Sequence, residues 1–309
     1  DRVQEDSYAT SQNLHPANFN RERLRAANSR KSSGAQPLAP PDVQRLAVEV
    51  IEAKYSFHKN AKPSHLFRDG KSTQQAEWGK LSFPWEGGSD SFRRPAEYIR
   101  ISQHSSAVRL ARILAKFWKI ERPSLLLSVA GGVASLELPP RLLNQAFARG
   151  LFNTCKSTRT LIITGGASSG VSALVAGAFT KSHHPPPIVG FMPWEKVLGN
   201  HCLKDNHGES KPRNYFAGAS NSAAGWLDAH HSHFVLVDAG EACGWQSELR
   251  LRQGVQQTYA QIYNVPCVLL VVQGGRGTLL SVQQALRIAT PVVLAAGSGG
   301  VADAISRYC

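Results

Sequence analysis

The chain has 309 residues, of which 42% are hydrophobic and 18% are charged. This apolar content is enough for a core, so a chain that is disordered throughout is excluded. At roughly 150 residues per domain, the length allows one large domain or one domain with an appendage. The longest apolar run, residues 265–272, suits a buried strand but is far shorter than the ~20 residues that cross a bilayer. We therefore expect the chain as given to be soluble.

The chain is basic, because 35 Lys and Arg residues against 22 Asp and Glu residues give a formal net charge of +13. Such a surface attracts nucleic acid, acidic lipid or phosphorylated small molecules, and a basic solvated face explains the charge equally well. No stretch has the roughly five or six like charges of a nucleic-acid arm, so no specific nucleic-acid partner is expected.

The cysteines indicate the redox compartment. Five cysteines occur at irregular spacing without a CxxC pair, and the N-terminus has no apolar signal region. Cys267 lies inside the long apolar run, where a free thiol behaves as a small hydrophobe. These features favour a reducing, cytosolic setting.

The N-terminal quarter differs from the rest of the chain. Residues 1–41 are polar and end in a proline-rich segment, so little of this region has anything to bury. Asp42 is then placed to cap a short amphipathic helix near 42–55, and residues 56–76 are polar again. We expect residues 1–76 to be largely disordered apart from that helix, and residues 77–309 to form the domain.

From residue 77 onward, apolar strands alternate with helical patterns. Strands are expected at 98–101, 125–129, 160–163, 187–191, 233–238, 266–272 and 291–295. Helices are expected between them, one capped by Ser105 or Ser106, one around 142–151 and one near 245–262, and a polar insertion runs from about 198 to 225. Continuous apolar strands separated by helices are typical of a parallel sheet covered on both faces. The sequence predicts an open, doubly wound, mostly parallel α/β domain of Rossmann-like type.

Four of these strands end in glycine-rich turns that open helices, at residues 130–132, 164–170, 274–278 and 297–300. In open α/β sheets, the carboxyl ends of the strands form the edge at which ligands bind. Glycines let the backbone approach a ligand closely, and helix N-termini favour anions such as nucleotide phosphates. Any one loop is explained as well by a tight turn, but four at one edge favour a nucleotide site. Neither GxxxxGK[ST] nor GxGxxG occurs, so nucleotide hydrolysis of the P-loop type and hydride transfer have no support.

Residues from about 78 to 309 resemble the N-terminal cytosolic domain of melastatin-subfamily transient receptor potential channels. This domain is a member of the SLOG nucleotide-sensing superfamily. The matching segments are Leu126–Gly132, Ile163–Gly166 with Gly170 and Val171, Leu227 and Asp228 with His231–Asp238, Pro266–Val268, Gly274–Leu279, Gly297–Gly299 and Val301–Asp303.

The resemblance implies a regulatory domain at the cytosolic face of the plasma membrane, in a homotetrameric, calcium-permeable cation channel. Its partners would be other domains and subunits of the channel, and contact with acidic lipid fits the basic charge. The membrane spans would lie beyond residue 309. The likeness is greatest to the ADP-ribose-gated branch, which implies ADP-ribose or a related adenine nucleotide as the ligand.

The resemblance also implies a set of ligand-binding residues between the glycine loops. In the segment from 249 to 252, the family's ligand-contacting arginine falls on Arg250, for which a solvated helix position is the alternative. Arg276 lies in a glycine loop at a strand end and is expected to meet an anion or to face water. The expected ligand-binding residues are Ala130, Gly131, Gly132, Gly165, Gly166, Arg250, Gly275, Arg276, Gly277, Thr278, Ser298 and Gly299.

Two departures from the family pattern support a different function. The family's threonine before the first glycine pair is Ala130 here, and the arginine after its Gly-Ser-Gly is Gly300. A structural assembly domain without a ligand is therefore the alternative.

An enzyme is the less favoured alternative. The segment 274–278 is similar to the glycine motif of nucleoside-monophosphate phosphoribohydrolases, which follow it with paired glutamates. Leu280 and Ser281 occupy those positions here, and neither ionises near neutral pH, so no catalytic residue is expected. Asp228 and Asp238 are interpreted as cap or turn groups.

No metal site is expected, because His201, Cys202, His207, His230, His231 and His233 lack a recurring ligand spacing. Trp194 is interpreted as a packing residue, with stacking on an adenine ring as the alternative.

Overall fold

The computed structural model describes residues 76–84, 95–132, 141–216, 225–240 and 244–309. All of them fall in the unit that runs from His58 to Cys309. The predicted N-terminal region, with its helix near 42–55, lies outside the described residues except for Ala76.

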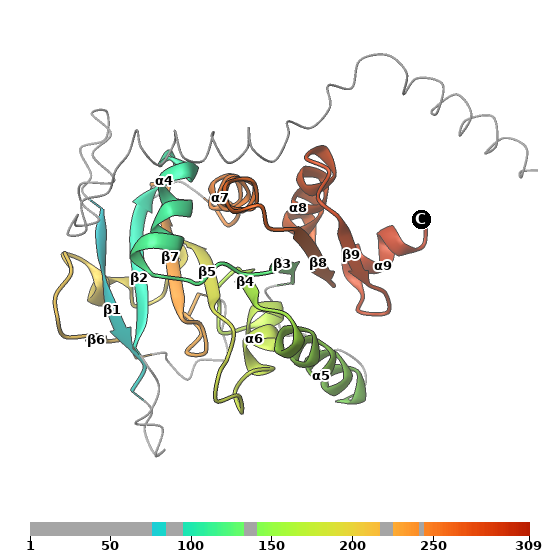
Figure 1. Cartoon of the computed structure of the whole chain (residues 1–309), viewed down its shortest axis with the longest axis horizontal. Coiled ribbons are helices and arrows are strands. Elements are labelled where there is room, and N and C mark those ends of the chain that lie inside the picture. Colours follow the sequence, from blue (N-terminus) through green and yellow to red (C-terminus); the bar gives the residue numbers. More distant parts are fainter. Residues whose placement is uncertain (1–75, 85–94, 133–140, 217–224, 241–243) are drawn as a thin grey trace, which may run out of the picture. The chain divides into compact units, whose positions relative to one another are not determined.

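The described residues form a nine-stranded sheet (Figure 1). In space, the strand order is β6-β1-β2-β7-β5-β4-β3-β8-β9, and the described neighbours are parallel except β1 and β2. The predicted open, mostly parallel α/β fold is thus confirmed. The strands are β1 (Glu77–Ser82), β2 (Ala96–Ser102), β3 (Leu125–Gly131), β4 (Thr160–Thr164), β5 (Ile188–Pro193), β6 (Arg213–Asn214), β7 (His233–Asp238), β8 (Cys267–Val272) and β9 (Val292–Ala295).

Helices cover both faces of this sheet. In Figure 1, α4, α7 and α8 lie on one face and α5 and α6 lie on the other. Ser106 caps α4, since its hydroxyl accepts a hydrogen bond from the backbone amide of Arg109. The helical elements are α4 (Ala107–Arg112), which continues as the π-helical η2 (Ile113–Phe117), α5 (Arg141–Ser157), α6 (Gly170–Gly177), η3 (Trp194–Lys196), η4 (Asn200–Leu203), α7 (Leu249–Tyr263), α8 (Arg276–Arg287) and α9 (Gly300–Ser306).

The two-sided core explains the uninterrupted apolar strands. Successive residues of a strand point to opposite faces, so a central strand buried on both sides needs an apolar residue at nearly every position. On β3, Leu126 packs with residues of α4 and α7, and Leu127 packs with residues of α6. All five residues of β4 are buried.

Some elements differ from the prediction. β1 and β6 were not expected, because β1 is short and interrupted by Gly79 and Lys80, and β6 is a two-residue strand inside the polar insertion. Both depend on pairing, β1 antiparallel to β2 and β6 parallel to β1. α7 begins at Leu249 rather than near 245, after Gln246 with a φ of 85°.

The strand order fixes where a ligand site can form. The chain runs outward from β3 through β4 and β5 to β7, then returns to the other side of β3 to form β8 and β9. The sheet therefore has a topological switch between β3 and β8, which is where doubly wound sheets bind ligands, beyond the carboxyl ends of the strands.

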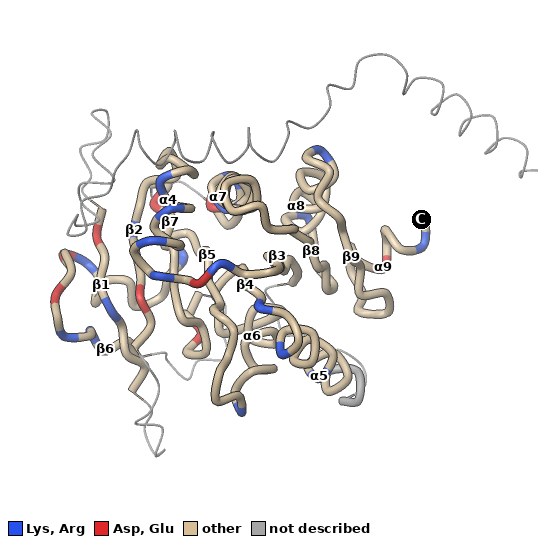
Figure 2. The backbone as a smooth tube through the Cα atoms, viewed as in Figure 1, with Lys and Arg blue, Asp and Glu red and all other residues tan. Residues whose placement is uncertain are grey.

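Among the described residues, no helix is long and apolar enough to span a membrane. Lys and Arg residues are spread over several elements rather than gathered on one of them (Figure 2).

Candidate functional site

A cavity of about 310 Å³ lies at the topological switch. Its wall contains the ends of β3, β4 and β5, the loop between β8 and α8, and the segment that leads into α7. Small-molecule sites in proteins usually enclose about 300–1,000 Å³, so the volume is that of a binding site at the low end of this range.

Two helices begin at this cavity. α6 contributes Val171 and Ser172 of its first turn, and α8 contributes Arg276, Gly277 and Thr278. Neither helix has an acidic residue in its first turn. Because each N-terminus presents unpaired N–H groups and about half a positive charge, this end of the cavity is suited to an anion.

Most of the residues predicted from the sequence meet at this cavity, although the loops come from three separate parts of the chain. Four are not among its lining residues, namely Gly166, Arg250, Ser298 and Gly299. Those that line it are Ala130, Gly131, Gly132, Gly165, Gly275, Arg276, Gly277 and Thr278.

A residue with a side chain would not fit at the position of Gly131. An added Cβ would lie 2.2 Å from Cγ2 of Val171 and 2.3 Å from the carbonyl oxygen of Val272. The absence of a side chain lets β3 and β8 pair closely beneath the first turn of α6. Glycine at this position therefore permits the close approach of β8 and of the first turn of α6 to the end of β3.

Gly166 is not among the residues that line the cavity, and it lies against Gly190 of β5 instead. It has a φ of 77°, and an added Cβ would lie 3.0 Å from Cα of Gly190 on β5. Its amide donates to the hydroxyl of Thr164, which lies 2.6 Å from Nε2 of His231, and His231 Nδ1 lies 3.3 Å from Oδ1 of Asp228. Gly166 thus fixes the loop that presents Gly165.

The fourth glycine loop supports the third instead of facing the cavity. The hydroxyl of Ser298 accepts a hydrogen bond from the amide of Gln273, and the amide of Val301 donates to the carbonyl of Gly274. Gly300 has a φ of 58°, and an added Cβ would lie 2.3 Å from the Gly274 oxygen. An arginine at this position, as in the family pattern, would require the two loops to separate.

α7 places Arg252, rather than Arg250, at the cavity. Arg250 is exposed and is not among the lining residues, while Arg252 is 6% exposed and lines the wall. Arg252 Nη2 donates to the carbonyls of Val129 and Ile163 and to the hydroxyl of Ser128. Burial lowers the pKa of Arg252 to about 10, so it stays protonated at neutral pH.

Helical periodicity gives a signal that the sequence reading missed. Residues at positions 248, 252 and 256 are four apart and therefore lie on one face of a helix. All three are polar and all three are buried, and Gln256 Nε2 donates to the Ser128 hydroxyl 2.8 Å away. The first two residues of this buried polar row line the cavity, and the row lies next to the apolar stripe of Leu251, Val255 and Tyr259.

Two further wall residues were missed because they precede α7. Trp245 is 42% exposed and lines the cavity, so it offers an aromatic face to a ligand. The side chain of Gln246 packs against Gly277, at which an added Cβ would lie 2.7 Å from the Gln246 Nε2. No periodic pattern pointed to these residues, since they belong to a turn.

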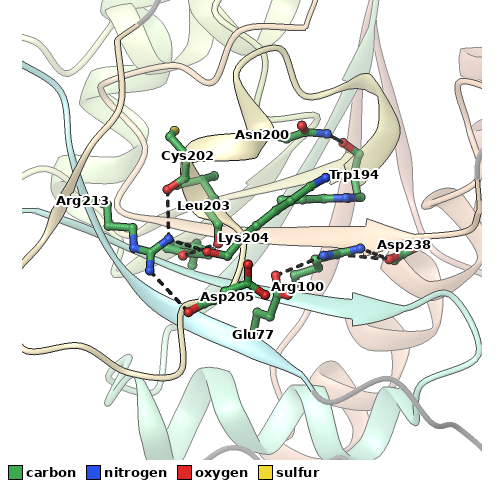
Figure 3. Close-up of polar contacts among 11 residues, drawn as sticks. Glu77, Arg100, Trp194, Asn200, Cys202, Leu203, Lys204, Asp205, Arg213 and Asp238 are labelled. Carbon is green, nitrogen blue, oxygen red and sulfur yellow. Dashed lines mark hydrogen bonds and ion pairs between the residues drawn. The ribbon is translucent and has the colours of Figure 1, made fainter.

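Trp194 is not among the residues that line the cavity, and it lies near Arg100 instead (Figure 3). The guanidinium carbon of Arg100 lies 4.2 Å from the centroid of the buried Trp194 ring. Arg100 also forms ion pairs with Asp238 at 2.6 Å and Glu77 at 3.1 Å. Burial acts to raise the pKa of Asp238, but the hydrogen bonds from Arg100 lower it overall. Trp194 and Asp238 are therefore parts of a structural cluster.

The polar insertion is held in place by Arg213 (Figure 3). Its guanidinium donates to the carbonyl oxygens of Cys202, Lys204 and Asp205 and forms an ion pair with Glu209 at 2.8 Å. These contacts explain why a sequence of polar residues folds against β1.

Within the part of the chain that the structure describes, no group of three or more His, Cys, Asp or Glu residues is placed to hold a metal ion.

Leu280 and Ser281 occupy the positions that correspond to the glutamates of the enzyme motif. Leu280 is 40% exposed, and the Ser281 hydroxyl donates to the Gly277 carbonyl within α8. Thr164, His231 and Asp228 are linked as in a nucleophilic triad, but Thr164 is buried at 1% exposure.

Comparison with known proteins identifies the family. Residues 96–308 match the family described as "SLOG in TRPM". The chain is 31% identical over 282 residues to transient receptor potential cation channel subfamily M member 7 of Mus musculus. The aligned region covers 84% of this chain and 14% of that protein. The chain is 32% identical over 299 residues to member 1 of Mus musculus, and the aligned region covers 90% of this chain and 17% of that protein.

A third relative is member 2 of Rattus norvegicus, which is 30% identical over 261 residues, or 76% of this chain and 17% of that protein. The chain thus spans between 14% and 17% of the length of these relatives. The family match covers the sheet from β2 onward and every loop of the cavity. The chain therefore belongs to the SLOG domain family of the melastatin-subfamily transient receptor potential channels.

Proposed function

We propose that this chain is the ligand-sensing regulatory domain of a melastatin-type cation channel, and that it binds ADP-ribose or a related adenine nucleotide. One observation carries this proposal. The glycine loops after β3, β4 and β8 and the N-termini of α6 and α8 meet at one cavity at the topological switch. Such an arrangement favours a ligand that presents phosphate oxygens to backbone N–H groups.

The charged side chains support the same ligand class. Arg276, the first residue of α8, is exposed at the cavity wall, and Arg252 lies buried in that wall. Two guanidinium groups beside two helix N-termini suit a diphosphate. In this proposal, the backbone of 275–278 holds one phosphate and Trp245 supplies an apolar face for the base.

Regulation of the channel follows from differential affinity. A ligand shifts a conformational equilibrium only by as much as its affinities for the two conformations differ. We place the domain at the cytosolic face of the plasma membrane in a homotetramer, where ligand binding changes its contacts with neighbouring domains and subunits. The net charge of +13 would add attraction to acidic lipid.

A structural assembly domain without a ligand is the second candidate. The exposed position of Arg250 and the close packing of Gly300 favour it, because neither position supplies the family's charged contact.

A thermal-shift titration of the 309-residue chain with ADP-ribose, AMP, NAD and cyclic ADP-ribose tests the proposal. A ligand at 100 times its dissociation constant adds about 2.7 kcal/mol to the free energy of unfolding, which raises the melting temperature measurably. A selective shift supports a ligand sensor. No shift with millimolar concentrations of all four compounds would contradict nucleotide sensing and leave the assembly function. Chromatography of the ligand afterwards would detect turnover, which is not expected.

A further inference from the structure

Glu248 is a buried acid at the cavity that neither the fold nor the phosphate site explains. It is 8% exposed and lines the cavity wall, directly before the first residue of α7. No donor among the described residues reaches its Oε2 atom. A buried acceptor without a partner is costly, so a carboxylate retained in this state points to a partner that comes from outside the chain.

The usual structural role of an acid at this place is not fulfilled. Glu248 occupies the N-cap position of α7, but its side chain makes no capping hydrogen bond. Arg252 lies one helical turn away, yet its Nη2 donates to Val129, Ile163 and Ser128 instead. Burial raises the pKa of Glu248, an effect that the backbone amides and the charge of Arg252 oppose.

We propose that Glu248 accepts hydrogen bonds from the ribose hydroxyls of the bound nucleotide, so that the site selects ribonucleotides. This inference rests on the proposed nucleotide function. α6 and α8 present N–H donors and no acidic residue in their first turns, whereas the N-terminus of α7 presents Glu248. The N-termini of α6 and α8 therefore suit an anion, and Glu248 suits a hydrogen-bond donor of the same ligand.

The position of Glu248 favours the ribose rather than the base. Two residues before it, the Gln246 side chain packs directly against Gly277 in the first turn of α8. The acceptor is therefore close to the loop that is proposed to hold phosphate, and the ribose is the group joined directly to that phosphate. In Rossmann-type sheets, an Asp or Glu outside the phosphate-binding glycine loop accepts a hydrogen bond from the ribose 2′-hydroxyl.

Isothermal titration of the 309-residue chain with ADP and with 2′,3′-dideoxy-ADP tests this inference, with ADP-ribose as the reference ligand. The two diphosphates share base and phosphates and differ only in the hydroxyls. We expect ADP to bind at least about tenfold more tightly than the dideoxy compound, since hydrogen bonds to charged groups have this magnitude. In Glu248→Ala, the two should bind equally, with the affinity of wild type for the dideoxy compound.

Glu248→Gln is the matched control, because it keeps a carbonyl acceptor of the same length and is expected to retain part of the preference. A merely structural Glu248 would instead weaken both diphosphates equally when replaced. Equal affinities in wild type, an unchanged preference in Glu248→Ala, or a failure of ADP to bind where ADP-ribose binds would each overturn the inference while the nucleotide function stands. If ADP-ribose itself did not bind, both the inference about Glu248 and the proposed nucleotide function would be contradicted.

Discussion

At the scale of single residues, two neighbouring arginines of one segment differ completely in their surroundings. Arg252 is buried among the carbonyls at the ends of β3 and β4, while Arg250 is exposed on α7. Each residue advances about 100° around a helix, so two positions differ by about 200° and face opposite sides. The helical phase thus decides which of the two arginines lines the cavity, and the exposed arginine at the cavity wall is Arg276.

Replacement of the two exposed arginines provides a charge-matched prediction. Arg276→Ala should weaken ADP-ribose binding about five- to tenfold, because an exposed guanidinium contributes a charge-assisted contact that solvent partly screens. Arg250→Ala removes the same charge outside the cavity and should change affinity by less than about twofold. Calorimetric titration measures both. Equal losses would mean that the ligand extends over the outer face of α7, as the family resemblance implies for Arg250.

His233 gives a prediction for stability against pH. It begins β7 with its ring centroid 4.7 Å from that of Trp118, and burial lowers its pKa to about 4. Because the pKa of His233 is lower in the folded state than in the unfolded state, its contribution to the free energy of unfolding is complete above pH ~6.5, the unfolded pKa. That contribution is lost as the pH falls toward 4. His233→Phe keeps the ring contact and should reduce the loss of unfolding free energy between pH 7 and 4.5 by about 2 kcal/mol.

Urea unfolding of the wild type and His233→Phe at the two pH values measures this difference. The acid titration of the carboxylates is common to both proteins and therefore cancels. Parallel losses in the two proteins would show that His233 does not titrate with a depressed pKa.

At the scale of elements, the N-terminus of α8 is the part of the cavity whose charge can be changed with the least disturbance. Gly275 precedes the helix with a φ of −122°, which any residue adopts, and no atom lies within 4 Å of an added Cβ. Asn and Asp are both good N-cap residues, so either should stabilise the free protein by a few tenths of a kcal/mol.

The two substitutions differ only in charge, so they separate binding from folding. Gly275→Asp places a carboxylate where a phosphate is proposed to bind and should weaken ADP-ribose at least about tenfold relative to Gly275→Asn. Melting temperatures and calorimetric affinities measured on both variants would decide this. If Asp and Asn bind the ligand equally, the anion is not held at the start of α8.

The glycine loops show how similar elements acquire different functions. The loops after β3, β4 and β8 contribute to the cavity, whereas the loop after β9 hydrogen-bonds to Gln273 and Gly274 and supports its neighbour. β9 is an edge strand on the far side of β8 from the switch. Its loop is therefore one strand too distant to border the cavity between β3 and β8.

At the scale of the whole molecule, the site is a product of strand order. β3 pairs with β4 on one side and with β8 on the other, although more than 100 residues separate β3 from β8 in the chain. Only this pairing brings the segments 130–132 and 275–278 to one wall with the start of α7. In the proposed function, a ligand held there would touch elements on both sides of the switch and would favour whichever arrangement of the domain it binds more tightly.

The sequence by itself determined the α/β class, most of the strands and the glycine loops, because burial on both faces requires apolar residues throughout a strand and tight strand-to-helix turns require glycine. The glycine loops and the family resemblance together pointed to eight residues of the cavity. Only the tertiary structure decided that Arg252 and Glu248 line the cavity, that Ser298 and Val301 hydrogen-bond to the loop after β8, and that β1 and β6 join the sheet. These outcomes depend on long-range pairing: the four-residue spacing of positions 248, 252 and 256 places them on one face of a helix, but only packing against the sheet buries that face.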